Sequence, residues 1–177
     1  MSHFFVRWVD ALSTRLGQMA AWMLMLACSL SAGNAVIRYT FNLGSNAWLE
    51  AQWYLFGAAV FLGAPALLKL NEHVRVDVIY GSREPRTRAW IDLLGLLLVL
   101  VPVCVITGWL SIHMVHDSYV QQEVSPSAGG LLRWPIKAMI PLGFALLALQ
   151  AVSEIIKRVG YLRGSYNMDI HYERPLQ

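Results

Sequence analysis

The sequence LLGLLLVLVPVCVITGWLSI, residues 93–112, decides the fold class of this chain. It carries no charged side chain, and a helix needs about 20 apolar residues to cross the hydrocarbon core of a bilayer. Further uncharged apolar runs occupy residues 16–37, 51–68 and 138–153. Because lipid offers no hydrogen-bonding partners, the backbone groups must pair within each segment, which favours helices. We therefore predict an all-α integral membrane protein with four transmembrane helices, at about residues 16–38, 48–69, 89–115 and 134–157.

The basic residues are distributed unevenly between the loops of such a protein. Of the 14 Lys and Arg residues, all but three fall in the N-terminal segment, the second loop or the C-terminal segment. The three on the opposite side are Arg38, Arg133 and Lys137. The positive-inside rule then predicts that both termini and the second loop face the cytoplasm, with a cytoplasmic tail over residues 158–177.

The composition fits a single membrane domain over residues 1–177. The chain is 56% hydrophobic and 14% charged, against about 25% charged residues in typical soluble domains. The net charge of +3 is explained by the basic loops, so we expect no nucleic-acid partner. Cys28 and Cys104 lie within apolar runs, where cysteine usually acts as a small core residue.

Apolar residues recur at helical spacing before the first run, and polar residues occupy the opposite face. This pattern fits either an interfacial helix lying in the membrane surface or a simple extension of the first span. In both cases the segment would anchor the chain. The apolar positions are Phe5, Trp8, Val9, Leu12 and Leu16, and the polar positions are Arg7, Asp10, Ser13 and Thr14.

Small residues and prolines mark possible contact points within the spans. Ser29 and Gly33 lie four residues apart, as do Ala59 and Gly63, a spacing that lets two helix backbones approach closely. Such pairs serve either internal packing or a partner protein. Three prolines can each kink their helix by removing an amide donor: Pro65, Pro102 and Pro141.

The four apolar runs contain no Asp, Glu, Lys or Arg, and this absence bears on function. A carrier that moves its own substrate usually has ionisable residues or broken helices near the bilayer centre, together with internal symmetry. No repeat relates the first two spans to the last two. The chain is therefore predicted to be a support or partner subunit.

Charged residues appear at the edges of the spans instead. Glu50 begins the second span, where a carboxylate either caps the helix or pairs with Arg38 or with a partner's basic residue. Two further pairs of opposite charge lie four residues apart, and we predict ordinary helical ion pairs in solvated turns for them. They are Arg88 with Asp92 and Glu154 with Arg158.

Histidines give only a weak indication of a metal or a haem. His113, His116 and Asp117 share a helical face at a spacing compatible with metal binding. A haem needs axial ligands from different spans, and the four apolar runs contain no histidine. We therefore expect no catalytic, cofactor-binding or metal-binding residues. A haem- or quinone-associated anchor of a respiratory enzyme remains an alternative, and a small proton-coupled efflux carrier is another.

Several motifs in order resemble a known family. They are WLEAQWYLF (residues 48–56), the Gly63–Ala64 pair and NEHVRVD (residues 71–77), joined by Asn34, Arg38 and Tyr39, by RAWID (residues 88–92) and by PLG (residues 141–143). This set resembles the small membrane subunit, of the DctQ type, of tripartite ATP-independent periplasmic (TRAP) transporters, over roughly residues 20–158. One departure is Ala51, which follows Glu50 where many members have a second carboxylate. The segment SAGGLLRWPIK (residues 127–137) is similar to a branch associated with mannitol, chloroaromatic acids and 2-oxo acids.

The resemblance implies a function for the chain. The subunit would lie in the bacterial inner membrane and act as a scaffold for a larger permease subunit that carries the substrate and sodium sites. A periplasmic binding protein would deliver an organic acid, and a sodium gradient would drive its uptake. No cofactor is implied.

Within that reading, polar and aromatic residues near the membrane edges are candidates for contacts with partners. Those of the second loop would hold that loop against the membrane or the large subunit. The basic and aromatic residues near position 134 would meet the docked binding protein or anchor in lipid. The candidates are Arg38, Trp48, Glu50, His73, Arg75, Asp77, Arg133, Trp134 and Lys137.

Overall fold

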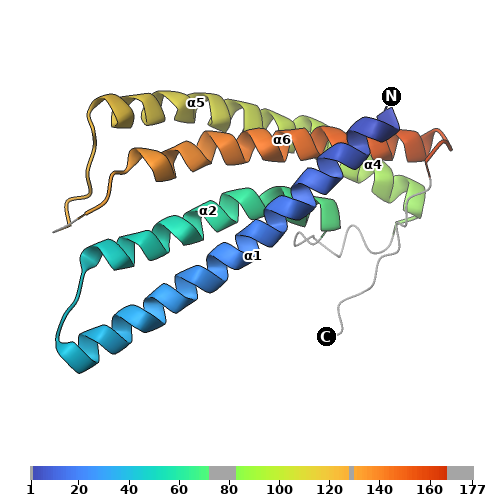
Figure 1. Ribbon diagram of the computed structural model, residues 1–177. Helices are drawn as coiled ribbons and strands as arrows, with labels where there is room; N and C mark the ends of the chain where they lie inside the picture. The colour runs from blue at the N-terminus through green and yellow to red at the C-terminus, as the bar shows by residue number, and fades with distance from the viewer. Residues whose placement is uncertain (1, 72–82, 128–129, 167–177) are drawn as a thin grey trace.

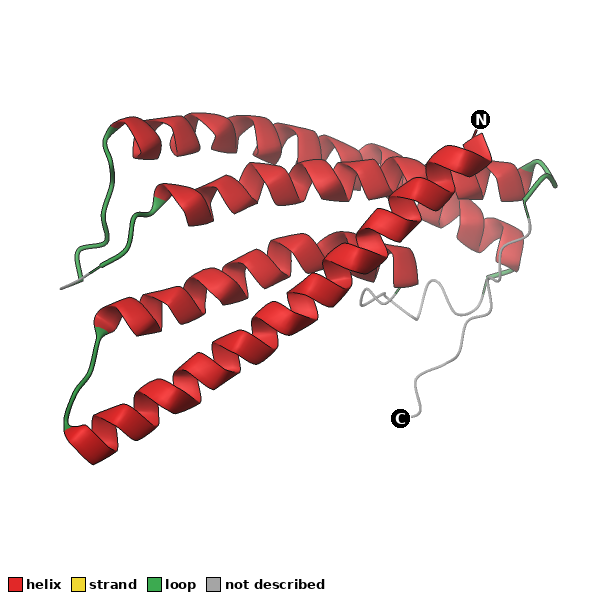
Figure 2. Cartoon of the chain, in the orientation of Figure 1, coloured by secondary structure: helices red, strands yellow, loops and turns green. Residues whose placement is uncertain are grey.

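The computed structural model describes residues 2–71, 83–127 and 130–166. Within these ranges the chain forms long apolar helices (Figures 1 and 2). Each is long and apolar enough to cross a membrane, so the prediction of an all-α chain with four such helices is confirmed. They are α1 (Ser2–Phe41), α2 (Asn46–Leu70), the continuous helix formed by α4 (Pro85–Gly95), η1 (Leu96–Leu100) and α5 (Val101–Val120), and α6 (Trp134–Leu162).

The helices form a layer more than a closed bundle. In Figure 1 they follow one another in the order α5, α6, α2, α1, and each packs on the next. Helix α1 also reaches α6, at the N-terminal end of α1. Within the most apolar window of each helix, only 11% to 28% of the residues are buried inside the chain. Lipid or partner proteins must therefore cover the broad faces of the layer.

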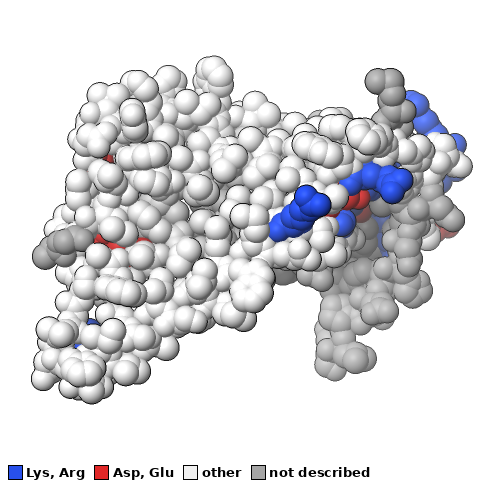
Figure 3. Space-filling model, in the orientation of Figure 1, with Lys and Arg blue, Asp and Glu red and all other residues white. Residues whose placement is uncertain are grey.

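The two ends of the layer differ in charge. The start of α1, the end of α2, the start of α4 and the end of α6 lie at one end, which we call the inner end (Figure 1). There the ring of His3 stacks on that of Tyr166, with centroids 5.8 Å apart. Figure 3 shows Lys and Arg gathered at this end and an uncharged middle. The α1–α2 and α5–α6 connections lie at the opposite, outer end. The direction in which the layer crosses the membrane stays a prediction.

Small residues bring α1 and α2 together. A Cβ atom on Gly17 would lie 2.7 Å from the Cβ of Ala66, and one on Gly63 would lie 3.3 Å from the Cβ of Ala20. A side chain at Gly17 would therefore collide with Ala66, and one at Gly63 would require α1 and α2 to shift slightly. The small residues of α2 around Gly63 therefore serve internal packing, as one of the two readings of this spacing predicted.

The pair in the outer half of α1 behaves differently. A Cβ atom on Gly33 would meet nothing within 4 Å. Ser29 is exposed, and its hydroxyl donates to the carbonyl of Met25 in its own helix at 2.9 Å. This part of α1 is thus available to lipid or to a partner.

Pro102 changes the helical winding without ending the helix. Because proline has no N–H, the hydrogen-bond ladder is interrupted at this position. The turn before it, η1, is π-helical, and the N–H of Val101 donates to the carbonyl of Leu96, five residues back. The apolar helix then continues to Val120.

The N-terminal segment is an extension of the first span, because α1 is one continuous helix of 40 residues. The buried face of this segment differs from its apolar face. Val6, Val9 and Ser13 are buried, whereas Trp8 is 54% exposed. The reason is that the polar side of this segment, with Asp10 and Ser13, packs against α6. Similarly, α6 continues to Leu162, so the first residues of the predicted tail are helical.

Candidate functional site

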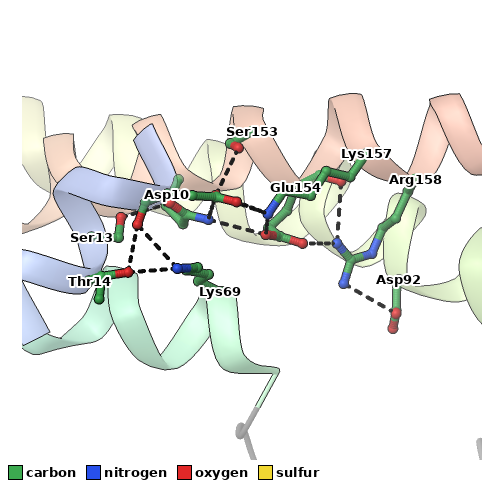
Figure 4. A network of polar contacts seen from close by, with 10 residues as sticks. Asp10, Ser13, Thr14, Lys69, Asp92, Ser153, Glu154, Lys157 and Arg158 are labelled. Atoms are coloured by element: carbon green, nitrogen blue, oxygen red, sulfur yellow. Dashed lines mark hydrogen bonds and ion pairs between the residues drawn. The ribbon is translucent and has the colours of Figure 1, made fainter. Parts of the chain in front are cut away.

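Two clusters of polar side chains lie in the layer, one at each end. The first, which we call the inner network, joins α1, α4 and α6 (Figure 4). Most of its side chains are buried in the protein. Its members are Asp10, Ser13, Asp92, Gln150, Ser153, Glu154, Lys157 and Arg158.

Gln150 connects α1 to α6 at the centre of this network. Its side chain is fully buried, and its amide oxygen accepts a hydrogen bond from the hydroxyl of Ser13 at 2.7 Å. Its amide nitrogen donates to Asp10 Oδ1 and to Glu154 Oε1, both at 3.1 Å. Every polar atom of this side chain is therefore satisfied, as burial requires.

Lys157 joins two carboxylates from different helices. Its Nζ lies 2.7 Å from Asp10 Oδ2 in α1 and 2.6 Å from Glu154 Oε1 in α6. The hydroxyl of Ser153 also donates to Asp10, at 3.3 Å. The ammonium thus holds the N-terminal part of α1 against the last turns of α6.

Arg158 extends the network to α4. Its Nη1 donates to Glu154 Oε2 at 2.5 Å, and its Nη2 lies 3.4 Å from Asp92 Oδ2. Nε is buried and has no hydrogen-bond partner in the described chain. The predicted pair of Glu154 with Arg158 is confirmed, but the prediction of a solvated turn is wrong. Glu154 is 3% exposed and Arg158 is 4% exposed, because α1 and α4 pack over this end of α6.

The inner network can act as a rigid joint. A buried ion pair gives little net stability relative to apolar packing, but removing one partner leaves an uncompensated charge and is strongly destabilising. In the network, carboxylates alternate with cationic groups across three helices. Their positions are therefore coupled, and helices that share such contacts resist moving apart.

Lys69 lies beside the network at the end of α2. Its Nζ donates to Thr14 Oγ1 at 2.6 Å and to the backbone carbonyl of Asp10 at 3.3 Å (Figure 4). Both acceptors belong to α1. Lys69 therefore ties the inner ends of α1 and α2 together through neutral oxygen atoms.

The second cluster, the outer cluster, fastens α2 to the α5–α6 connection. Glu50 is buried, accepts a hydrogen bond from the hydroxyl of Ser125 and accepts another from the backbone N–H of Leu131 at 2.8 Å. The hydroxyl of Tyr54 donates to the carbonyl of Leu132 at 3.1 Å. Glu50 lies in the second turn of α2, and no ion pair joins it to Arg38 in the part of the chain described. Glu50 therefore joins two distant segments of the chain. This role differs from the predicted capping of the helix and from the predicted ion pair with Arg38.

The rest of the outer cluster surrounds Glu123. Lys137 donates to Glu123 Oε2, the Ser118 hydroxyl donates to the same atom at 2.7 Å, and Arg133 Nη1 lies 3.9 Å from Glu123 Oε1. The hydrogen bonds from Lys137 and then Ser118 hold the pKa of Glu123 below its ordinary value. Backbone hydrogen bonds between residues 123–125 and 131–133 complete a short antiparallel contact in this connection.

The predicted partner residues fall into four groups. Glu50, Arg133 and Lys137 come together with Tyr54 around a cavity of about 420 Å³ at the outer end. Arg38 and Trp48 remain exposed near that end. Trp134 makes an edge-to-face contact with Tyr119, with ring centroids 5.4 Å apart. The remaining candidates, His73, Arg75 and Asp77, lie outside the described residues.

The histidines of the third span show no metal site. His116 Nδ1 lies 3.5 Å from Asp117 Oδ1, and both side chains are exposed. Among the described residues, no group of three or more His, Cys, Asp or Glu side chains is arranged to hold a metal ion.

The sequence nevertheless contained an indication of the inner network. Gln150, Ser153, Glu154 and Lys157 recur at intervals of three and four residues, so they share one face of a helix. A polar face directly after an apolar run is easily read as solvated. Only the packing of Asp10 and Ser13 on the same face shows that it is buried.

Comparison with known proteins identifies the family. Residues 27–160 match the family described as Tripartite ATP-independent periplasmic transporters, DctQ component. No curated protein and no solved structure shows a significant match to the chain. This match confirms the predicted resemblance to the DctQ type. The family consists of transporter components and not of enzymes, so the prediction that the chain is not an enzyme is also confirmed. The match favours the transporter over the respiratory-anchor alternative. Because the match covers most of the chain, this protein belongs to the DctQ component family of the TRAP transporters.

Proposed function

We propose that this chain is the small permease subunit that braces the large permease subunit of a TRAP transporter in the bacterial inner membrane. The large subunit would carry the substrate and sodium sites and would move an organic acid across the bilayer. A periplasmic binding protein would deliver that acid. Membership of the DctQ family implies the other components of a tripartite transporter in general, and the finer roles are our proposal.

The observation that carries this proposal is the layered arrangement of the helices. Its broad apolar faces are covered only in part by the chain itself, so they can accept a large membrane partner. Helix association in lipid depends on close van der Waals packing and on a small number of interhelical hydrogen bonds. The outer half of α1 around Gly33 offers such a surface without the loss of an internal contact.

The placement of charge supports a bracing role. The uncharged runs fill the middle of the layer, and both polar clusters lie at its ends. Substrate and ion sites of secondary transporters lie near the bilayer midplane and use broken helices or ionisable groups. The inner network and the outer cluster instead tie helix ends to one another.

The test is sodium-driven uptake by the reconstituted transporter. Vesicles that contain both membrane subunits, supplied with the binding protein and a sodium gradient, should accumulate the organic acid. Vesicles with the large subunit alone should lose most of this uptake. Equal uptake with and without this chain would refute the bracing role. Uptake that is unchanged by removal of the sodium gradient would refute only the coupling.

The second loop provides a test of pairing between the subunits. On the proposed function, Arg75 holds that loop against the large subunit or the membrane. Arg75→Glu should then weaken association of the two subunits, measured by the fraction of the large subunit that co-purifies with this chain. Arg163→Glu, in an exposed position after α6, is the matched control. Unchanged association for Arg75→Glu would remove Arg75 from the interface.

The outer cavity is the proposed contact for the binding protein. Arg133 and Lys137 line it and bring positive charge to the outer end of the layer. Complementary charge mainly affects the rate of association and its dependence on salt. Arg133→Gln should therefore slow docking of the binding protein and weaken its salt dependence. Docking rates that are identical to those of the unmodified chain would leave lipid anchoring as the role of Arg133.

A further inference from the structure

A groove runs between α1 and α2 from the inner end toward the middle of the layer. Its volume is about 810 Å³, and its walls are apolar over most of their length. Ala21, Leu24, Phe56 and Val60 belong to these walls. Polar groups occur only at the inner end, where Thr14, Gln18 and Lys69 line it.

Lys69 differs in its contacts from Lys157 and Arg158, the two buried cations of the inner network. Lys157 contacts two carboxylates, and Arg158 also contacts two. Lys69 donates to a hydroxyl and a backbone carbonyl, and within the described residues no carboxylate lies within 4 Å of its Nζ. Its positive charge is therefore not neutralised by these contacts. A half-buried ammonium in this position favours an anion as an additional partner.

We propose that the groove binds one anionic phospholipid of the leaflet at the inner end. The phosphate of the headgroup contacts Lys69, with Thr14 and Gln18 as neighbouring hydrogen-bonding groups, and an acyl chain lies along the apolar walls. This proposal requires only that the chain spans a membrane, so it is independent of the bracing role.

A phospholipid fits the groove because the groove is polar and basic at the inner end and apolar along the rest of its length. An acyl chain is flexible and fills an irregular apolar channel between two helices. The headgroup phosphate then lies at the membrane edge, beside Lys69 in the last turn of α2. Basic pockets between membrane helices on the cytoplasmic side are suited to acidic headgroups. A protein helix would have to place a carboxylate or phosphate at the same depth to meet Lys69 equally well.

The experiment counts lipids bound to the full-length chain by native mass spectrometry. The chain is placed in nanodiscs with equal amounts of phosphatidylglycerol and phosphatidylcholine that have identical acyl chains. The unmodified protein should retain one phosphatidylglycerol in preference to phosphatidylcholine. Lys69→Gln should lower that preference about fivefold, since one basic residue near the headgroups contributes about that factor. Lys69→Arg should keep it.

Matched variants separate the groove from general charge. Arg15 follows Thr14 in α1 but is exposed and does not line the groove. Arg15→Gln should therefore keep the preference for phosphatidylglycerol. Ala21→Phe fills the groove and should lower retention of both lipids, whereas Ala32→Phe, on the exposed outer half of α1, should not. The proposal is overturned if the unmodified chain retains the two lipids equally, or if Arg15→Gln has the same effect as Lys69→Gln.

The assembled transporter gives an independent outcome. If this chain is purified with its permease partner, the same phosphatidylglycerol should remain bound. A permease helix seated against Ala21 and Lys69, detected by cross-linking, would identify a protein occupant and contradict the lipid. Failure of the chain to pair with a permease would affect the bracing role and leave the lipid result unchanged.

Discussion

Glu154 is the residue on which the inner network depends most. It accepts hydrogen bonds from Gln150, Lys157 and Arg158, and it is almost fully buried. Each of these donors would lose a charged acceptor if the carboxylate were removed. Leaving a buried cation without its partner destabilises the folded protein by more than the intact pair stabilises it.

Glu154→Gln should therefore destabilise the chain by about 3 kcal/mol, the lower end of the range for a broken buried ion pair. The measurement is thermal unfolding of the purified protein in mild detergent. Arg163→Gln, at an exposed position shortly after α6, should change stability little. A loss of similar size in both variants would show that the network has no special importance.

Glu50→Gln tests the outer cluster. The glutamine keeps the size of the side chain but weakens the charge-assisted hydrogen bonds from Ser125 and Leu131, each worth roughly 1.5–3 kcal/mol. The amide of Leu131 should then exchange with solvent faster. Asp117→Asn, which removes an exposed carboxylate near the same end, should leave that exchange unchanged. Unaltered exchange in Glu50→Gln would mean that this contact does not hold the α5–α6 connection.

Glu123 should contribute to the pH dependence of the outer end. Its pKa is lowered in the folded chain, so the stabilisation from ionised Glu123 is fully present above the ordinary glutamate pKa of about 4.3. It is lost as the pH falls from there through the lowered pKa. Amide protection in the α5–α6 connection should decrease over that interval. Glu123→Gln should remove this contribution, and an identical pH profile in the variant would contradict it.

At the scale of residues, the sequence predicted contacts along a helix better than contacts between helices. The pairing of Glu154 with Arg158 follows from their spacing and was predicted. The contacts of Lys157 with Asp10, and of Glu50 with Leu131, join residues far apart in the chain. No local spacing contains that information, because it depends on which helices become neighbours.

At the scale of helices, glycine decides how closely neighbours approach. A Cβ atom on Gly143 of α6 would lie 2.6 Å from the Cβ of Phe61 in α2. By contrast, the same atom on Gly33 would meet nothing within 4 Å. Replacing glycine by alanine should therefore destabilise the protein at Gly143 and stabilise it at Gly33.

Gly143→Ala should destabilise the protein by about 1–3 kcal/mol, because α2 and α6 must separate to admit the methyl group. Gly33→Ala should stabilise it by roughly 0.5–1 kcal/mol, as expected for glycine in a helix interior without steric conflict. Thermal unfolding of both variants under the same conditions measures the difference. Equal effects would mean that the closeness of α2 and α6 at Gly143 is not a constraint.

The helices themselves were readily predicted, since long uncharged apolar runs have few alternatives in lipid. The face of the N-terminal part of α1 was not. Apolar periodicity grouped Trp8 with Val9, but Trp8 is exposed, Val9 is buried and Asp10 faces α6. In a membrane protein the apolar side can face lipid, so periodicity alone does not identify the packed face.

At the scale of the whole molecule, the arrangement of the helices explains the proposed role. A layer in the order α5, α6, α2, α1 leaves two wide apolar faces, and the clusters at both ends hold its helices in register. The sequence indicated a support subunit through the absence of charge in its spans. It did not indicate the layer, because the order of packing depends on contacts such as those of Gly17 and Gln150.

The most direct test of the account is to purify this chain gently from its native membrane and to determine by mass what accompanies it. We predict a large permease subunit in a one-to-one complex, which the unmodified chain retains and a variant with a disrupted scaffold, Glu154→Gln, retains less well. Recovery of the chain alone, as a homodimer, or with a redox enzyme would contradict the account.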